Sequence, residues 1–329
     1  MTRAGARRVT LTLAAAAVVV GLAVAVVVVM GALHRAARAA DVVAIDETAA
    51  PKDYPAALLA QIKLVEVDLD REASTMQLDL TAVGADMYDP ESLRLNGRLT
   101  VQAGDAAAPA ALQTIVIARG DKGTTVPVEL DLGGNVQDYP RDVHRGRLLL
   151  LAIYEPVRGG PPQKLPILLK AYGAWPGLDV EFATPHSSFD GDQMSAREVA
   201  LTLRRSHATV TVAYFSIALT WVLIITVVGM TMSVVLGQRE PQLVMLAFFG
   251  TLLFGLTEFR NMLPGAPPSG AYSDYLAFYW AYGVVIVAVG VIGGLWLYRR
   301  GSRRDRQAGA AGEDDALAGD VPADPADFS

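Results

Sequence analysis

The chain has no cysteine, five lysines and four histidines among its 329 residues. Without cysteine, neither a disulfide framework nor a thiolate metal site can form. Any folded domain must therefore be stabilised by its own hydrophobic core. The four histidines are His34, His144, His186 and His207. They are too scattered in the sequence to have the spacing of metal ligands.

Sequence motifs of catalysis and phosphate binding are also missing. The chain has no Gly-x-Ser-x-Gly nucleophile elbow, no Gly-x4-Gly-Lys phosphate loop and no His-Glu-x-x-His zinc helix. Asp68, Asp70 and Glu72 are spaced like the start of a calcium loop, but the required glycine and distal glutamate are absent. We therefore predict no catalytic residue, no cofactor and no metal site, and we expect that the protein is not an enzyme.

The charge pattern argues against a nucleic-acid partner. The net charge is −6 and residues 41–200 are predominantly acidic, whereas nucleic-acid binding requires a basic face. The arginines gather instead near the two ends of the chain, next to apolar stretches. This distribution is typical of a translocated domain that is flanked by cytoplasmic arginines.

Long apolar runs are abundant. Hydrophobic residues make up 52% of the chain and the mean hydropathy is +0.32, which are ordinary values for a multi-span membrane protein. Four runs have roughly the 20-residue length that crosses the hydrocarbon core. They predict a cytoplasmic N-terminus (1–8), transmembrane helix one (9–33), an extracytoplasmic β-rich domain (34–207), transmembrane helices two (208–236) and three (242–263), an outer loop (264–274), transmembrane helix four (275–298) and a cytoplasmic disordered tail (299–329).

The first apolar run has an alternative interpretation as a cleaved signal peptide, with a small-residue site near Ala37-Arg38-Ala39. The apolar region of a signal peptide is about 7–15 residues long, and residues 11–33 form a longer run. We therefore expect an uncleaved anchor. A mature protein that starts near Ala40 remains the alternative, and it would have three spans.

The arginine distribution predicts the orientation. Four spans put both termini on the same side of the membrane, and the positive-inside rule makes that side the cytoplasm. Arg204 and Arg205 would lie on the outer side, but they belong to a long domain, whose translocation depends little on charge. We therefore predict a multi-pass protein of the cell membrane, surrounded by lipids, with both termini cytoplasmic.

Between residues 41 and 205, apolar and polar residues alternate with a period of two. The alternation is clear at Met76, Leu78 and Leu80 and again over residues 126–132, and turn clusters such as Gly133-Gly134-Asn135 separate the runs. Short alternating runs of this kind predict an antiparallel β-sandwich. The predicted fold class is a membrane protein with an extracytoplasmic antiparallel β-sandwich and four transmembrane helices, one before the sandwich and three after it.

Glu258 and Arg260 interrupt the end of the third span. Carboxylates inside a membrane are energetically unfavourable and often functional, but these residues lie near the outer end of the span, where they can reach water. Both interfacial anchoring and a functional role remain open for Glu258. Helical spacing places the following residues on one stripe, of which Thr251 and Glu258 are polar: Ala247, Thr251, Phe254 or Gly255, and Glu258.

Two stretches near the C-terminal end are distinctive: RNMLPGAPPSG at residues 260–270 and DYLAFYW at residues 274–280. Tyr139-Pro140-Arg141-Asp142 and Arg204-Arg205-Ser206 accompany them. Together, over most of residues 40–300, these residues resemble the membrane-protein family called domain of unknown function 4436. Arg141 departs from the family, in which an aromatic residue often follows Tyr-Pro. The resemblance implies the layout of the chain and no activity.

The layout is also similar to that of pentameric ligand-gated channels, which have an outer β-sandwich with an aromatic-Pro-x-Asp turn and an arginine before the first of their spans. This resemblance implies a junction between domain and membrane that is formed here by Tyr139, Pro140, Asp142, Arg204 and Arg205. The departures are large. No proline interrupts the second span, no fourth helix follows the domain, and the third span is rich in phenylalanine rather than hydroxyl groups.

We therefore expect a non-enzymatic envelope protein whose outer β-sandwich binds a protein partner or a ligand. The alternative is a channel-like homo-oligomer in which the third span lies nearest the pore axis. Thr251, Glu258 and Arg260 are then the candidate pore or interface residues. Glu258 from several subunits would form an acidic ring, which favours cations.

Overall fold

The computed structural model describes residues 31, 43–47, 56–88, 94–156, 160–184, 196–265 and 267–318. The chain divides into two compact units. The first unit holds the strands, helix α2 as far as Phe215, and the loop Leu263–Ser273, and the second holds the remaining helical segments. The predicted first transmembrane helix (9–33), apart from Gly31, lies outside the described residues, as do residues 1–8 and 319–329.

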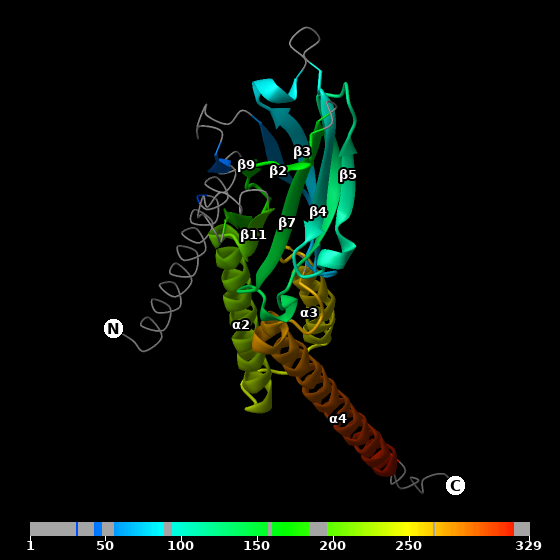
Figure 1. Cartoon of the computed structure of the whole chain (residues 1–329). Helices are drawn as coiled ribbons and strands as arrows, with labels where there is room; N and C mark the ends of the chain where they lie inside the picture. The colour runs from blue at the N-terminus through cyan, green and yellow to red at the C-terminus, as the bar shows by residue number, and fades with distance from the viewer. Residues whose placement is uncertain are drawn as a thin grey trace, which may run out of the picture. The chain divides into compact units, whose positions relative to one another are not determined.

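The first unit contains two β-sheets (Figure 1). Their apolar faces share one hydrophobic core. One sheet has the strand order β1 (Val43–Asp46), β9 (Ile167–Tyr172), β2 (Ala57–Asp68), β3 (Ala73–Val83) and β6 (Gly123–Asp131). The other has the order β10 (Leu178–Ala183), β11 (Ala196–Arg205), β7 (Val143–Pro156), β4 (Gly97–Asp105) and β5 (Gln113–Ile117), with β8 (Gln163–Lys164) beside β7. Short 3-10 turns occur at η1 (Ala85–Met87), η2 (Pro109–Ala111) and η3 (Val136–Asp138).

The period of two in the sequence is the period of burial in the strands. In β3, Met76, Leu78 and Leu80 are buried, whereas Gln77 and Asp79 lie on the other face and are only partly buried. Each fully buried leucine contributes about 1.5–3 kcal/mol to folding. Such positions recur in both sheets, so a hydrophobic core can stabilise this cysteine-free domain.

We predicted an antiparallel sandwich, but one of its strand pairs is parallel. Strand β9 pairs with β2 in parallel, with Leu58 opposite Ile167 and Lys63 opposite Tyr172. It also pairs with β1 on its other side, so it is a central strand. Central parallel strands are apolar on both faces, and Ile167, Leu168 and Leu169 are accordingly all buried.

The strand registers bring two chain segments to the same end of the sandwich. Val43, at the start of β1, pairs with Tyr172 at the end of β9. The short connection from β9 leads to Leu178, which pairs with Arg205 at the end of β11. Helix α2 begins at His207. The start of β1 therefore lies at the end of the sandwich where α2 begins.

Three helices that are long and apolar enough to cross a membrane follow the sandwich within the described residues. They are α2 (His207–Val235), α3 (Leu243–Asn261) and the helix that starts with a π-helical turn (Asp274–Phe278) and continues as α4 (Tyr279–Ala318). In the second unit, Phe249 and Leu256 of α3 pack with Val285 of α4 and Val227 of α2. The three apolar helices predicted after the sandwich are thus present.

Helix α4 is longer than the predicted fourth span, because it continues to Ala318. We expected a disordered tail from residue 299, but residues 299–318 are helical. Their composition explains the difference. Alanine and arginine, which recur in this stretch, have high helix propensity, and a helix that has already been nucleated extends readily.

Candidate functional site

A buried group of polar side chains lies at the end of the sandwich from which α2 starts. It begins with η3, whose first turn is capped by Asn135, since the Asn135 side chain accepts a hydrogen bond from the Gln137 amide at 3.1 Å. Tyr139 follows η3 and is fully buried. The Tyr139–Pro140 peptide bond is cis. Two residues further on, Asp142 precedes β7 and is also buried.

Asp142 accepts hydrogen bonds from two basic side chains. The Arg205 Nε atom lies 3.1 and 3.0 Å from the two carboxylate oxygens, and the His144 Nε2 atom lies 3.2 Å from Oδ2. The Arg205 guanidinium also lies over the Tyr139 ring, 5.2 Å from its centroid. We call these four residues, Tyr139, Asp142, His144 and Arg205, the junction cluster.

Burial and charge shift the acid–base properties of two members of the junction cluster. Burial raises the pKa of Tyr139 to about 12, with the Arg205 charge opposing this change and the Asp142 charge adding to it. Burial alone would raise the pKa of Asp142, but the hydrogen bond from His144 and the charge and hydrogen bond of Arg205 outweigh it and lower the pKa. Asp142 is therefore a stable anion and Tyr139 a neutral hydrogen-bond donor at neutral pH.

The lowered pKa of Asp142 predicts an acid-dependent loss of stability. Because the folded state holds this carboxylate below its ordinary value of 3.8, its contribution is complete above that value and is lost as the pH falls through the lower, folded-state value. The apparent melting temperature of the wild type should therefore approach that of Asp142→Asn below pH 3.8. Thermal unfolding at a series of pH values measures this. A gap between the two proteins that stays constant down to the lowest pH at which both fold would contradict it.

The junction cluster contacts the loop Leu263–Ser273, which joins α3 to the following helix. The Tyr139 hydroxyl donates a hydrogen bond to the Pro264 carbonyl at 3.0 Å, across 125 residues of sequence. Gly265 has φ +82°, and a Cβ atom built there would overlap Arg205 Nη1. Only glycine fits at this position, since it combines a left-handed backbone with close approach of a charged side chain.

The start of α2 is attached to the same end of the sandwich. Ser206 precedes the helix, and its Oγ accepts a hydrogen bond from the Thr209 amide at 3.2 Å, which is an N-cap. The Thr209 hydroxyl donates to the Gly177 carbonyl at 3.0 Å, and the Ser206 amide donates to the same carbonyl at 3.0 Å. Arg141, which departs from the family pattern, lies over the ring of Tyr214 on α2, 5.6 Å from its centroid.

Of the five residues predicted to form this junction, Arg205 contacts both Asp142 and Tyr139. Pro140 is buried beside Tyr139 in the cis turn. Arg204 is exposed, because neighbouring residues of a strand point to opposite faces. The structure therefore distinguishes the two arginines: Arg205 belongs to the junction cluster and Arg204 does not.

The predicted residues of α3 fall into two groups within the second unit. Arg260 forms two hydrogen bonds of 2.9 Å with Asp274, so it joins the C-terminal end of α3 to the start of the next helix. Thr251 and Glu258 are exposed on α3. The Thr251 hydroxyl donates to the Ala247 carbonyl at 3.0 Å, as is common for hydroxyl side chains in helices.

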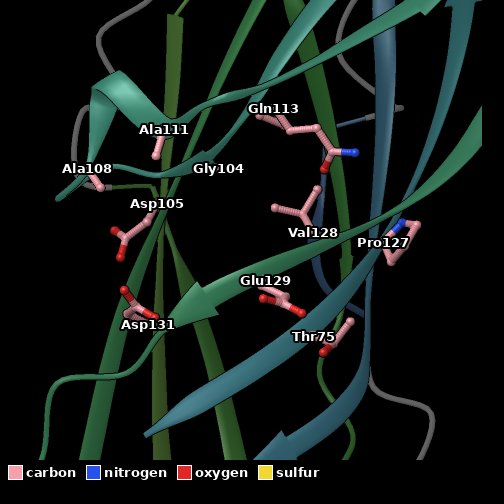
Figure 2. A pocket seen from close by; sticks show the side chains of 11 residues that line it. Thr75, Gly104, Asp105, Ala108, Ala111, Gln113, Pro127, Val128, Glu129 and Asp131 are labelled. Atoms are coloured by element: carbon pink, nitrogen blue, oxygen red, sulfur yellow. The ribbon is translucent and has the colours of Figure 1, made fainter.

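The sandwich also contains a cavity of about 430 Å³ between its two sheets. Figure 2 shows that the carboxylates of Asp105 and Asp131 face each other at one end of it, with Glu129 nearby and Gln113 toward the other end. Three carboxylates favour a positively charged group on any molecule that enters. Among the described residues, no group of three or more His, Asp or Glu side chains is arranged to hold a metal ion.

A second polar cavity, of about 320 Å³, lies next to the junction cluster and reaches Arg205 and Gly265. Asp68 and Asp70 in the turn between β2 and β3, together with Trp175 before β10, form part of its wall. This space borders the contact between Arg205 and the loop Leu263–Ser273.

Sequence reasoning missed His144, Pro264 and Gly265 as members of this region. His144 was treated as an ordinary histidine, although its place two residues after Asp142 puts both on one face at the start of β7. The Pro264-Gly265 pair signals a turn. No local pattern could have shown that this turn lies against Tyr139, because the contact joins distant parts of the chain.

Comparison with known families divides the chain at the end of β11. Residues 48–204 match the family described as domain of unknown function (DUF4436), and residues 205–299 match the one described as domain of unknown function (DUF8686). The distinctive stretches at residues 260–270 and 274–280 thus fall in the second match, and Tyr139-Pro140-Arg141-Asp142 falls in the first. No curated protein matches the chain. The sandwich domain, over residues 48–204, therefore belongs to the domain of unknown function 4436 family.

Proposed function

We propose that the protein is a non-enzymatic membrane receptor whose outer sandwich binds a ligand or protein partner and passes its state to the membrane helices through the junction cluster. The observation that carries this proposal is the hydrogen bond from the Tyr139 hydroxyl to the Pro264 carbonyl. It joins the sandwich directly to the loop between α3 and the helix that follows. In this account the sandwich acts on the start of α2, through the Ser206 amide and the Gly177 carbonyl, and on the loop that follows α3.

Three features support coupling rather than mere attachment. The junction cluster is buried and charged, so its bonds depend strongly on geometry. A polar cavity beside it leaves the loop Leu263–Ser273 room for a second position. The acidic cavity in Figure 2 provides a place where the sandwich could take up a basic group. A receptor requires a site, a path and an element with two positions.

The same proposal places the sandwich outside the cytoplasm and both termini inside it. Three apolar helices follow the sandwich, and with the apolar run at residues 11–33 they give four crossings. The arginines at residues 299–306 then lie on the cytoplasmic side. The partners in this account are membrane lipids and an outer ligand or protein.

A fluorescent label on the loop Leu263–Ser273 tests whether binding to the sandwich changes the surroundings of the loop. The chain has no cysteine, so Ser269→Cys, at an exposed loop position, can carry a single environment-sensitive fluorophore on the full chain in nanodiscs. Antibody fragments selected against the sandwich serve as artificial ligands. We expect some of them to change the emission, and we expect Tyr139→Phe to reduce that change several-fold, since it removes the bond to Pro264.

Tyr88→Phe is the matched control for Tyr139→Phe. It removes a similar bond, from the Tyr88 hydroxyl to the Ala82 carbonyl at 2.6 Å. Ala82 lies near the end of β3, level with the start of β9 and far from the start of α2, so the response should survive. The proposal fails if no bound fragment changes the emission, or if both tyrosine variants respond like the wild type.

One observation favours a second function, that of a channel-like homo-oligomer with α3 nearest the axis. The predicted stripe of α3 is exposed in the single chain, and Phe254 is 79% exposed. The opposite face, with Met245, Phe249 and Leu256, is buried against the other helices. A face that includes a carboxylate at Glu258 is better suited to an oligomer axis or to water than to lipid.

The oligomer proposal predicts a defined assembly and a cation flux that depends on Glu258. Native mass spectrometry in mild detergent should give one oligomeric state. In liposomes, Glu258→Gln should lower the cation flux several-fold because it neutralises the acidic ring. Glu240→Gln, which removes a charge from the connection between α2 and α3, should leave the flux unchanged. A strict monomer without flux would end this alternative and leave the receptor proposal in place.

A further inference from the structure

An apolar groove lies between α2 and α4 in the second unit, with a volume of about 470 Å³. Helix α2 contributes Val228, Thr231, Met232 and Val235, and α4 contributes Trp280, Gly283, Val284, Val287, Ala288 and Val291. Within this lining, the hydroxyl of Thr231 already donates to the Val227 carbonyl at 2.8 Å. An occupant therefore needs to offer no hydrogen bond and is itself apolar.

The shape of the groove suits a helix. Its residues on α4 recur every three or four positions from Trp280 to Val291, so the groove follows the helix axis for about three turns. Gly283 opens its floor, since a Cβ built there would meet no atom within 4 Å. Val287 and Met232 on its walls are 64% and 52% exposed. Small residues along such a groove allow a further helix to approach closely.

The apolar run at residues 11–33 is long enough to line the groove. It precedes β1, which starts at the end of the sandwich where α2 begins. Val43 begins β1 at the end where α2 starts. The nine residues 34–42 separate it from the apolar run at residues 11–33, and nine residues can reach up to about 30 Å when extended. A tether of this length keeps the segment at a high effective concentration near the groove. A free lipid chain has no such advantage.

The composition of this segment matches the groove. Thr12 is the one polar side chain in residues 11–33, and Ala17, Gly21 and Ala25 recur every four residues along one face. We propose that residues 11–33 form a membrane-spanning helix whose small-residue face occupies the groove between α2 and α4. The segment before the sandwich then completes a four-helix arrangement with the three helices that follow it.

Disulfide formation in the full chain tests this arrangement, because the chain has no cysteine of its own. Val287→Cys on α4 is combined with one cysteine at a time at positions 14–28. A protease site inserted into residues 34–42 then shows whether oxidation in native membranes has linked the two fragments. We expect links within one chain that recur every three or four positions, with Met232→Cys on the other wall of the groove giving the same result.

Phe254→Cys is the matched control, since Phe254 is 79% exposed on α3 and does not line the groove. It should form no links with the same positions within one chain. Absence of links for both Val287→Cys and Met232→Cys would overturn the proposal and leave the groove to lipid. Links found exclusively between two chains would also overturn it, and would assign the groove to a second copy.

Discussion

Replacing Asp142 by asparagine is expected to lower the apparent melting temperature of the sandwich by on the order of 10 °C. The substitution leaves the Arg205 charge buried and without its carboxylate, with side-chain exposures in the intact pair of 5% and 0%. Removing one partner of a buried ion pair typically costs about 3–5 kcal/mol. In a domain of this size, each 1 kcal/mol shifts the melting temperature by about 2–4 °C. This is the largest effect that we expect from a single polar substitution in the protein.

Two comparisons show whether the effect belongs to the ion pair. Asp138→Asn alters an exposed carboxylate of the preceding 3-10 turn and should change the melting temperature little. The double variant Asp142→Leu with Arg205→Met removes both charges, and it should be less destabilised than the two single losses added together. Differential scanning fluorimetry on the full chain in detergent measures all of these. Additive losses in the double variant would show that Arg205 and Asp142 do not stabilise each other.

The second large effect is expected at Gly265. In Gly265→Ala, the added Cβ would overlap Arg205 Nη1, in a backbone with φ +82°. A flexible arginine could move aside easily, but this one is held by Asp142 through Nε and by stacking on Tyr139. Either the guanidinium or the loop must therefore shift. We expect Gly265→Ala to destabilise the loop contact by several kcal/mol, about the strength of a buried charged hydrogen-bonded pair.

Gly270→Ala separates this contact from the backbone effect. Gly270 belongs to the same loop and has φ +88°, but a Cβ built there would meet no atom within 4 Å. Alanine in this conformation costs roughly 1–2 kcal/mol from the left-handed backbone alone. Thermal unfolding should therefore rank the proteins wild type, Gly270→Ala and Gly265→Ala in order of decreasing stability. Equal losses in the two variants would mean that Arg205 does not press against the loop.

The strands with alternating leucine and valine were predictable from sequence, and β2, β3 and β6 are examples. Strand β4 was not predicted, although Leu99, Val101 and Ala103 are buried at alternate positions. Its signal is weak because Gly97 and Gly104 interrupt it and the third apolar residue is small. The parallel pairing of β9 with β2 could not be predicted from sequence either. The partner of a strand depends on the whole topology rather than on the strand itself.

The opposite orientations of Arg204 and Arg205 were predictable in principle. In β11, Leu201 and Leu203 point into the core, and a period of two then puts Arg205 on the inner face and Arg204 on the outer one. We named both arginines because the strand itself was not predicted. Asp274 was missed as the partner of Arg260 for a different reason: a loop of unknown path separates the two residues.

The contacts between the sandwich turn and the loop Leu263–Ser273 could not have been predicted from periodicity or composition. Tyr139 and Pro264 carry no complementary pattern, and their contact is set by the positions of two separate turns. The resemblance to channels named one side of the junction, namely Tyr139, Asp142 and the arginines. The other side of the junction is the loop Leu263–Ser273, which only the fold of the first unit reveals. Our central claim is that the sandwich holds this loop.

Hydrogen–deuterium exchange of the loop amides tests that claim most directly. The full chain in nanodiscs is compared with Tyr139→Phe, which loses the bond to the Pro264 carbonyl, and with Tyr88→Phe, which loses an equivalent bond to Ala82. If the sandwich holds the loop, peptides covering Leu263–Ser273 exchange faster in Tyr139→Phe and at the wild-type rate in Tyr88→Phe. Unchanged exchange of these peptides in Tyr139→Phe would contradict the account.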